Sequence, residues 1–195
     1  MALIKDVPGK VNADKGHPDG QGAAGQYNPL MRPLAVVFRW LRYNRYTVAA
    51  LLGLLDEALD ATRFSLSVAG SRQELLSVLA RNDAPVVAYS FTSLEAPAVA
   101  REIRWLRRQP RPPAAILCGG PHPSARPEEI LAWGADAAFV GEAEESLPAF
   151  LREFADAERL PAEHVIQPLP LRHFDEYPPF AALRAAEKPT APVKV

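Results

Sequence analysis

The sequence predicts an α/β domain with a doubly wound, five-stranded parallel sheet. Five short apolar runs of strand length alternate with five segments in which apolar residues recur at helical spacing. Capping residues or a proline mark the start of several of these helices. Alternating strands and helices require right-handed crossovers between parallel strands, and these place helices on both faces of the sheet.

The first half of the domain is expected to supply three strands and two helices. The strands are predicted at residues 34–38, 64–69 and 85–90. The first helix is indicated by apolar residues on one helical face: Val48, Leu51, Leu52, Leu55 and Leu59. The second begins with a capping box, in which Ser71 and Glu74 satisfy free backbone N–H groups at the helix start.

The second half is expected to supply two strands and three helices. The strands are predicted at residues 114–120 and 135–143. Thr92 with Glu95 opens the helix that precedes them, and Pro127 suits the first position of the helix between them. The last helix is indicated by apolar residues at helical spacing: Leu147, Phe150, Leu151 and Phe154.

The bulk composition excludes several classes of partner and site. The 195 residues carry a formal net charge of −1, so neither a nucleic-acid nor a membrane-surface partner is expected. A single cysteine, Cys118, excludes an internal disulfide and a cysteine-bound zinc site. No apolar run approaches the roughly 20 residues of a membrane span, and no export signal opens the chain. A reducing, cytoplasmic location is therefore expected.

Composition also divides the chain into three parts. Residues 1–30 hold five of the 11 glycines among polar residues and are expected to form a disordered leader. Residues 31–160 carry the alternating strands and helices of the α/β domain. Residues 161–195 include the proline-rich run "PLPLRHFDEYPPF" and are expected to form a linker toward another module.

Polar and glycine-rich segments follow the predicted strands, at the sheet edge where ligands of open parallel sheets bind. These segments are residues 39–47, 69–71, 90–93, 118–124 and 141–146. Their hydroxyls, glycines and helix N-termini suit phosphate and amide groups, whereas paired acid–base residues are few. The sequence therefore predicts a binding edge without catalytic residues.

Several common occupants of such an edge are excluded. The first loop, "RWLRYNRYT", has no glycine and so lacks the nicotinamide-binding fingerprint, and the chain has no P-loop. A phosphoacceptor receiver domain needs acidic residues where Arg39 and Ser90 stand. Cys118 lacks the preceding glycine of a nucleophile elbow and is interpreted as a small core residue.

A histidine, two glutamates and a group of arginines could each have a functional role or a purely structural one. His122 stands alone between two prolines, so it is interpreted as a loop histidine that faces solvent or a ligand amide rather than a metal ligand. Glu142 and Glu144 could act as acid–base residues, although the helix dipole favours carboxylates in a first turn in any case. The arginines at 101–111 are interpreted as a solvated face or a domain contact.

One run of the sequence resembles a known family. "GGPHPSARPEEILAWGADAAFVGEAEESLPAFL" is similar to the last two strand–loop–helix units of the cobalamin-binding domain found ahead of radical S-adenosylmethionine (SAM) domains. In that family one strand ends in G-G-P-H and the next in G-E-G-E, and here Ala143 replaces the second glycine. The similarity spans about residues 34–180 and includes "AYSFTS" and the linker-like "FDEYPPF". It implies a flavodoxin-like or Rossmann-like fold.

The resemblance implies that cobalamin binds at the carboxyl edge of the sheet. Glycines without a Cβ would line a slot for the nucleotide tail, and nearby hydroxyls would hydrogen-bond tail or corrin amides. The first loop would pass the lower face of the corrin. The implied cofactor contacts are Asn44, Tyr46, Ser90, Phe91, Thr92, Ser93, Gly119, Gly120, Pro121, His122, Gly141, Glu142 and Glu144.

Two departures refine this expectation. No D-x-H-x-x-G occurs, so a base-off corrinoid without a protein histidine on cobalt is implied. No C-x-x-x-C-x-x-C occurs, so no iron–sulfur cluster is expected in this chain, which is not a complete enzyme alone. The leading hypothesis is a cobalamin-binding module that presents its cofactor to a radical SAM domain or subunit.

Two alternatives belong to other functional classes. A truncated or degenerate domain would serve as a non-catalytic interaction module, and its purified form would be colourless rather than red. A flavodoxin-like enzyme for a small phosphorylated substrate would fit the polar edge, but only His122 or Glu142 could be its general base.

Overall fold

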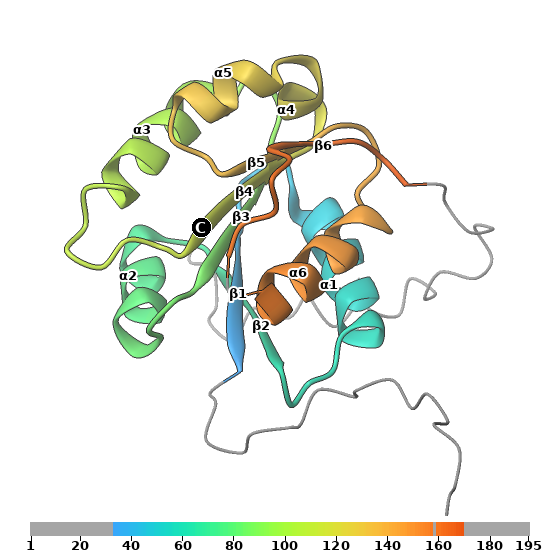
Figure 1. Ribbon diagram of the computed structural model, residues 1–195. Helices are drawn as coiled ribbons and strands as arrows, with labels where there is room; N and C mark the ends of the chain where they lie inside the picture. The colour runs from blue at the N-terminus through green and yellow to red at the C-terminus, as the bar shows by residue number, and fades with distance from the viewer. Residues whose placement is uncertain (1–32, 158, 170–195) are drawn as a thin grey trace, which may run out of the picture. The chain divides into compact units, whose positions relative to one another are not determined.

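The computed structural model describes residues 33–157 and 159–169, which form a parallel sheet covered by helices on both faces (Figure 1). The strands are β1 (Leu34–Arg39), β2 (Phe64–Ala69), β3 (Val86–Ser90), β4 (Ala115–Gly119), β5 (Ala137–Phe139) and β6 (Val165–Ile166). The helices are α1 (Arg45–Ala58), α2 (Arg72–Arg81), α3 (Ala96–Leu106), α4 (Pro121–Ala125), α5 (Pro127–Ala132) and α6 (Ser146–Ala157). The predicted leader and residues 170–195 of the predicted linker lie outside the described residues.

The sheet has the strand order β2-β1-β3-β4-β5-β6, and every neighbouring pair is parallel. The predicted doubly wound, flavodoxin-like α/β fold is therefore confirmed. The strand order reverses at β1, which lies between β2 and β3. The loops after β1 and β3 consequently leave toward opposite faces and open a crevice at the carboxyl edge, where ligands of this architecture bind.

The predicted number of five strands is wrong by one. β6 pairs with β5 through Ala138 opposite Val165 and Phe139 opposite Ile166. It lies inside the proline-rich stretch that the sequence analysis assigns to a linker. A strand of two residues is too short to produce an alternating pattern, so its apolar residues give no signal in the sequence.

The two faces of the sheet bury separate apolar clusters. Val36 of β1 packs in the cluster beneath α1 and α6, whereas its neighbour Val37 packs in the cluster beneath α2, α3 and α5. Figure 1 shows these two groups of helices on opposite sides of the strands. Because the central strands are covered on both faces, they read as continuous apolar runs rather than as alternating ones.

The local signals at the helix starts are confirmed in part. Ser71 Oγ accepts a hydrogen bond from Glu74 N at 3.1 Å, as the capping box predicts, although the Glu74 carboxylate accepts from Gly70 N at 2.8 Å. α5 begins at Pro127 as predicted. α3 begins only at Ala96, because residues 93–95 form a turn. The short helix α4, which the sequence analysis does not anticipate, occupies "PHPSA".

Candidate functional site

A cavity of about 330 Å³ opens at the carboxyl ends of β3 and β4, on the face covered by α1 and α6. Its walls are mainly apolar, and its polar groups come from the loops that follow the strands. The residues that line it are Phe38, Thr47, Leu51, Ala88, Tyr89, Ser90, Leu117, Cys118, Gly119, Gly120, Pro121, Ser124, Phe139, Gly141, Glu142, Ala143, Glu144 and Leu147. An apolar pocket with a few convergent polar groups is typical of a cofactor site.

The cavity brings together seven of the thirteen predicted contact residues. They are Ser90, Gly119, Gly120, Pro121, Gly141, Glu142 and Glu144. The other six, Asn44, Tyr46, Phe91, Thr92, Ser93 and His122, do not line it.

The β4 turn approaches the β3 loop so closely that residue 120 has no room for a side chain. Gly120 has a φ of 96°, and a Cβ there would lie 3.0 Å from Phe91 N, Phe91 O and Ser90 Oγ. Phe91 N also donates to Gly119 O, at 3.1 Å. Glycine is therefore required at residue 120 both by its backbone conformation and by this close approach.

Ser124 connects the two glycine turns beside the cavity. Its hydroxyl donates to Gly120 O at 2.9 Å and accepts from Gly141 N at 2.9 Å. One hydroxyl thus fixes the β4 turn relative to the β5 turn. The sequence analysis includes Ser124 in a polar segment but does not single it out, since the contact to Gly141 depends on the tertiary fold.

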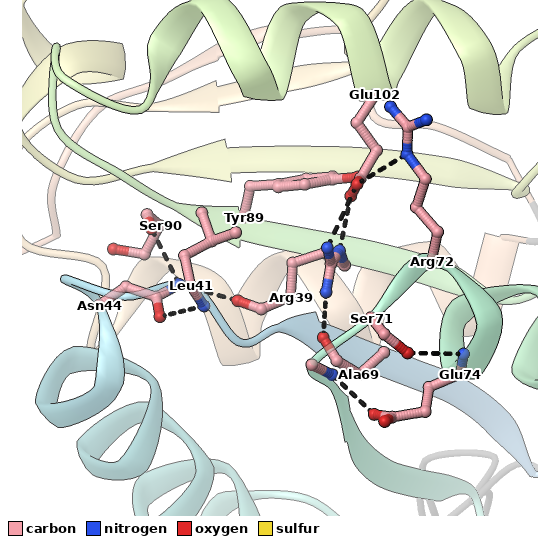
Figure 2. A network of polar contacts seen from close by, with 11 residues as sticks. Arg39, Leu41, Asn44, Ala69, Ser71, Arg72, Glu74, Tyr89, Ser90 and Glu102 are labelled. Atoms are coloured by element: carbon pink, nitrogen blue, oxygen red, sulfur yellow. Dashed lines mark hydrogen bonds and ion pairs between the residues drawn. The ribbon is translucent and has the colours of Figure 1, made fainter. Parts of the chain in front are cut away.

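Asn44 holds the β1 loop against the end of β3 (Figure 2). Its buried amide donates to Arg39 O at 2.7 Å and to Ser90 O at 3.0 Å, and accepts from Leu41 N at 2.7 Å. These bonds use both amide hydrogens within the protein. The arrangement favours a structural role for Asn44, and its contact with a corrin stays a prediction.

Exposed apolar side chains lie in the segments that follow β1 and β3 at the carboxyl edge of the sheet. Tyr46 is 71% exposed, Tyr43 57% and Leu94 81%. Glu95 joins their loops, because its carboxylate accepts from Tyr43 N at 3.4 Å and from Thr92 N at 3.3 Å. Large exposed apolar groups beside a cavity provide a surface for a flat, partly apolar ligand.

His122 lies in an aromatic stack on the opposite side of the turn. Its ring is buried 5.7 Å from the ring centroids of both Phe91 and Trp133, and its Nδ1 lies 3.0 Å from Ser93 Oγ. Its Nε2 and the hydroxyl of Thr92 are buried without a hydrogen-bond partner. The predicted solvent- or ligand-facing histidine is therefore a packed one in this structure.

Glu144 has an unusual environment for a carboxyl group. Its Oε2 atom is buried without a hydrogen-bond partner at the cavity wall. Burial raises the pKa of Glu144, and the backbone N–H groups of Glu144 and Ala143 oppose this shift. The neighbouring Glu142 raises the pKa further, both by its charge and by a side-chain hydrogen bond. Glu144 therefore keeps its proton to a higher pH than an exposed glutamate does.

The structure gives Cys118 the character of a core residue. Burial, and secondly the carboxylate of Asp136, raises the pKa of the fully buried thiol well above its usual range. A thiol that stays protonated is a poor nucleophile. Among residues 33–157 and 159–169, no group of three or more His, Cys, Asp or Glu side chains is placed to hold a metal ion. In the same part of the chain, no helix is both long and apolar enough to cross a membrane.

The opposite face of the sheet carries a buried ionic network (Figure 2). Glu102 accepts from Arg39 Nε at 2.5 Å, from Tyr89 Oη at 2.9 Å and from Arg72 Nε at 3.4 Å, and Arg39 also donates to Ala69 O. Burial opposes the charge of both groups, but the ion pair prevails, so the pKa of Glu102 is lowered and the pKa of Arg39 is raised. Burial, followed by Glu102, raises the pKa of Tyr89.

One comparison with known proteins shows the family of this chain. The family model described as B12 binding domain matches residues 43–151, which is more than half of the chain. A crystal structure of the N-terminal domain of a hypothetical protein from Thermotoga maritima is 28% identical, with a TM-score of 0.46, over 66% of this chain and 94% of that one. The curated proteins gave no match. The chain belongs to the B12-binding domain family.

Proposed function

We propose that this domain holds cobalamin in its base-off form at the carboxyl edge of the sheet and presents it to a radical SAM domain or subunit. Membership of the B12-binding family supports cobalamin as the ligand. The observation that carries the proposal is the cavity between the two glycine turns, at the position where the fold binds ligands.

The residues around the cavity fit the nucleotide tail of a corrinoid. The cavity has the volume of a small-molecule site, for which about 300–1,000 Å³ is typical, and its apolar walls suit an aromatic base. Gly120 lets the β4 turn pack directly on the β3 loop at the edge of the cavity, because no side chain fits between them. Ser90, Glu142 and Glu144 would hold polar atoms of the tail, and Tyr46 and Leu94 would contact the corrin ring.

The histidines of the described residues support a base-off form without a protein ligand on cobalt. His122, the histidine nearest the cavity, is enclosed between aromatic rings rather than directed into the cavity. His164 makes a 2.8 Å contact with Asp136 O. Neither residue is among those that line the cavity. The sequence likewise lacks the D-x-H-x-x-G of domains that supply such a histidine.

The proposed partner follows from what a corrinoid domain needs for catalysis. When bound, cobalamin carries a methyl group or tunes radical chemistry, and the protein supplies its orientation and surroundings. With one cysteine, this chain cannot bind the iron–sulfur cluster of a radical SAM enzyme by itself. The resemblance of "FDEYPPF" to the family's linker supports a radical SAM domain or subunit as that partner.

The cofactor part of the proposal is tested by loading purified protein with hydroxocobalamin, removing free corrinoid and recording the visible spectrum. We expect retained corrinoid with a base-off spectrum. Gly119→Leu should abolish retention, because a Cβ at this residue points toward Phe139 in the cavity wall and requires no positive φ. A folded, colourless wild-type protein would contradict the proposal and favour an interaction module.

Gly70→Leu is the matched control for this substitution. Gly70 lies in an exposed bend after β2, outside the cavity, and a Cβ there has only Glu74 Oε2 at 3.6 Å within contact distance. It should retain corrinoid like the wild type. Equal loss of corrinoid in both variants, with folding intact, would show that the cavity is not the site.

The partner part of the proposal needs a separate experiment. Corrinoid-loaded and corrinoid-free protein are used to capture proteins from cells of the source, and the captured proteins are identified by mass spectrometry. We expect the loaded form to enrich a protein with the C-x-x-x-C-x-x-C motif. Enrichment of other classes alone would contradict the radical SAM assignment and leave the cofactor assignment intact.

A further inference from the structure

We propose that Glu144 recognises the lower base of the corrinoid by donating a hydrogen bond to the base nitrogen that has left the cobalt. The domain would then prefer corrinoids whose base carries such a nitrogen, as benzimidazoles and purines do, over corrinoids with a phenolic base. This inference rests on the proposed function, because it assumes that the nucleotide tail occupies the cavity.

The geometry of Glu144 carries the proposal. Its side chain lies at the wall of the cavity, and its Oε2 atom is buried without a hydrogen-bond partner. Buried polar atoms of native proteins are nearly always hydrogen-bonded, so an unpaired one at the wall of a binding cavity indicates a missing ligand atom. The partner of Glu144 would therefore be a polar atom of the molecule that fills the cavity.

The base-off form of the corrinoid has a nitrogen atom that needs a hydrogen-bond donor. When the base detaches from cobalt, its nitrogen regains a lone pair that accepts a hydrogen bond. In water this lone pair is solvated, but between apolar walls such as Phe38, Leu117 and Phe139 it would be an unsatisfied acceptor. Leaving such a group unpaired costs roughly 1–3 kcal/mol.

The other donors at the cavity are less suited to this atom. The hydroxyl of Ser124 already donates to Gly120 O. Thr47 is exposed in the first turn of α1, and the Cys118 thiol is a weak donor. Ser90 is the remaining competitor, and the experiment below distinguishes it from Glu144.

A protonated carboxyl group is needed for this hydrogen bond, and the surroundings of Glu144 favour one. Burial and the nearby Glu142 raise its pKa. Among the described residues that line the cavity, none is an arginine, lysine or histidine that would stabilise the carboxylate. The preference for a nitrogen-bearing base should consequently weaken as pH rises through the pKa of Glu144.

The test compares three corrinoids: cobalamin, a p-cresolyl cobamide and cobinamide, which has no nucleotide tail. Dissociation constants are measured by visible-absorbance titration for the wild type, Glu144→Leu and Glu144→Gln. The ratio of the constants for cobalamin and the p-cresolyl cobamide is the readout. Comparing this ratio between proteins cancels the cost of detaching the base, which is a property of the ligand.

We expect Glu144→Leu to reduce the preference for cobalamin over the p-cresolyl cobamide about tenfold relative to the wild type, which is the effect of one buried hydrogen bond. Glu144→Gln should keep the preference, because its amide still donates, and should remove the part of its pH dependence that comes from the carboxyl group. Glu128→Gln is the matched control, because Glu128 is exposed on α5 outside the cavity, and it should behave as the wild type.

Three outcomes would overturn the proposal or its basis. An unchanged preference in Glu144→Leu would assign recognition to another group, such as Ser90. Equal wild-type affinity for the p-cresolyl cobamide and cobinamide, neither of which has a coordinated base to detach, would show that the tail is not held in the cavity, although the corrinoid function would stand. Failure of the wild type to bind any of the three would overturn the proposed function itself.

Discussion

Two buried carboxyl groups, one on each face of the sheet, have opposite surroundings. Beneath α2 and α3, Glu102 accepts hydrogen bonds from Arg39, Tyr89 and Arg72, and none of these four side chains is among the buried groups without a partner. On the face of α1 and α6, Glu144 lies at a cavity wall with an unpaired buried oxygen. The surroundings of Glu102 are those of a complete structural network, whereas those of Glu144 are those of a binding site that lacks its ligand.

This difference shows how a ligand site is distinguished from a structural network of similar composition. Both faces bury carboxyl groups, but the pKa of Glu102 is lowered by its partners and the pKa of Glu144 is raised by burial. A perturbed pKa alone does not separate function from structure. The hydrogen bonds of the single oxygen atoms separate them better, because both carboxylate oxygens of Glu102 are bonded, whereas Glu144 Oε2 at the cavity wall is not.

The largest expected effect comes from breaking the scaffold network. Glu102→Leu should lower the free energy of unfolding by about 3–5 kcal/mol, because it leaves the buried guanidinium of Arg39 without its counter-charge. Urea unfolding followed by circular dichroism measures this change. The double variant Arg39→Met/Glu102→Leu should lose less than the sum of the single losses, and additive losses would show that the two groups are not coupled.

A smaller loss of stability is expected when Asn44 is replaced. Asn44→Ala removes the three hydrogen bonds that hold the β1 loop to the end of β3. We expect the free energy of unfolding to fall by about 2–3 kcal/mol, the effect of several buried hydrogen bonds. A change below about 0.5 kcal/mol in the same urea experiment would contradict the role of Asn44 as a structural clamp.

On the cavity face, Ser124→Ala should affect binding more than stability. The substitution removes the hydroxyl that joins Gly120 and Gly141. We expect a stability loss of about 1 kcal/mol or less and a severalfold weaker affinity for cobalamin. Ser77→Ala is a suitable control, because Ser77 is exposed and its hydroxyl donates to Gln73 O within α2, outside the cavity. Equal affinities for both variants would show that the turns are held without Ser124.

The smallest effect is the pH dependence of stability, which should have opposite sign on the two faces. The lowered pKa of Glu102 stabilises the fold above its ordinary value of 4.5, and this stabilisation is lost as pH falls through the lowered pKa. The raised pKa of Glu144 makes stability fall as pH rises from 4.5 through the raised pKa.

Unfolding curves measured across this range for Glu144→Gln separate the two contributions. The variant should lose the decline on the high-pH side and keep the loss on the acid side. An unchanged profile would show that Glu144 titrates as an exposed carboxyl group does.

Much of the fold could be predicted from the sequence, because local patterns determine it. The five longer strands follow from apolar runs, and Ser71 and Pro127 mark helix starts that the structure confirms. β6 could not be predicted, since two residues give no period. α4 was also missed, because its five residues are too few to show a helical period of apolar residues.

The candidate site was only partly predictable. The motif predicts the glycine turns and Glu144 as site residues. The hydrogen bonds of Ser124 to Gly141 and of Asn44 to Ser90 could not be predicted, because they join segments far apart in the sequence. Glu102 gave a signal that the sequence analysis did not use. It is a charged residue on the same helical face as Val99 and Ile103, and such a residue is buried only when it is paired.

The central claim is that the cavity face, not the network face, receives the corrinoid. Hydrogen exchange of the backbone amides, measured by mass spectrometry with and without bound cobalamin, tests this claim most directly. We predict slower exchange in residues 119–124 and 141–147 when cobalamin is bound, with no change in residues 99–106 of α3. Protection confined to α2 and α3, or no protection in a protein that retains cobalamin, would contradict it.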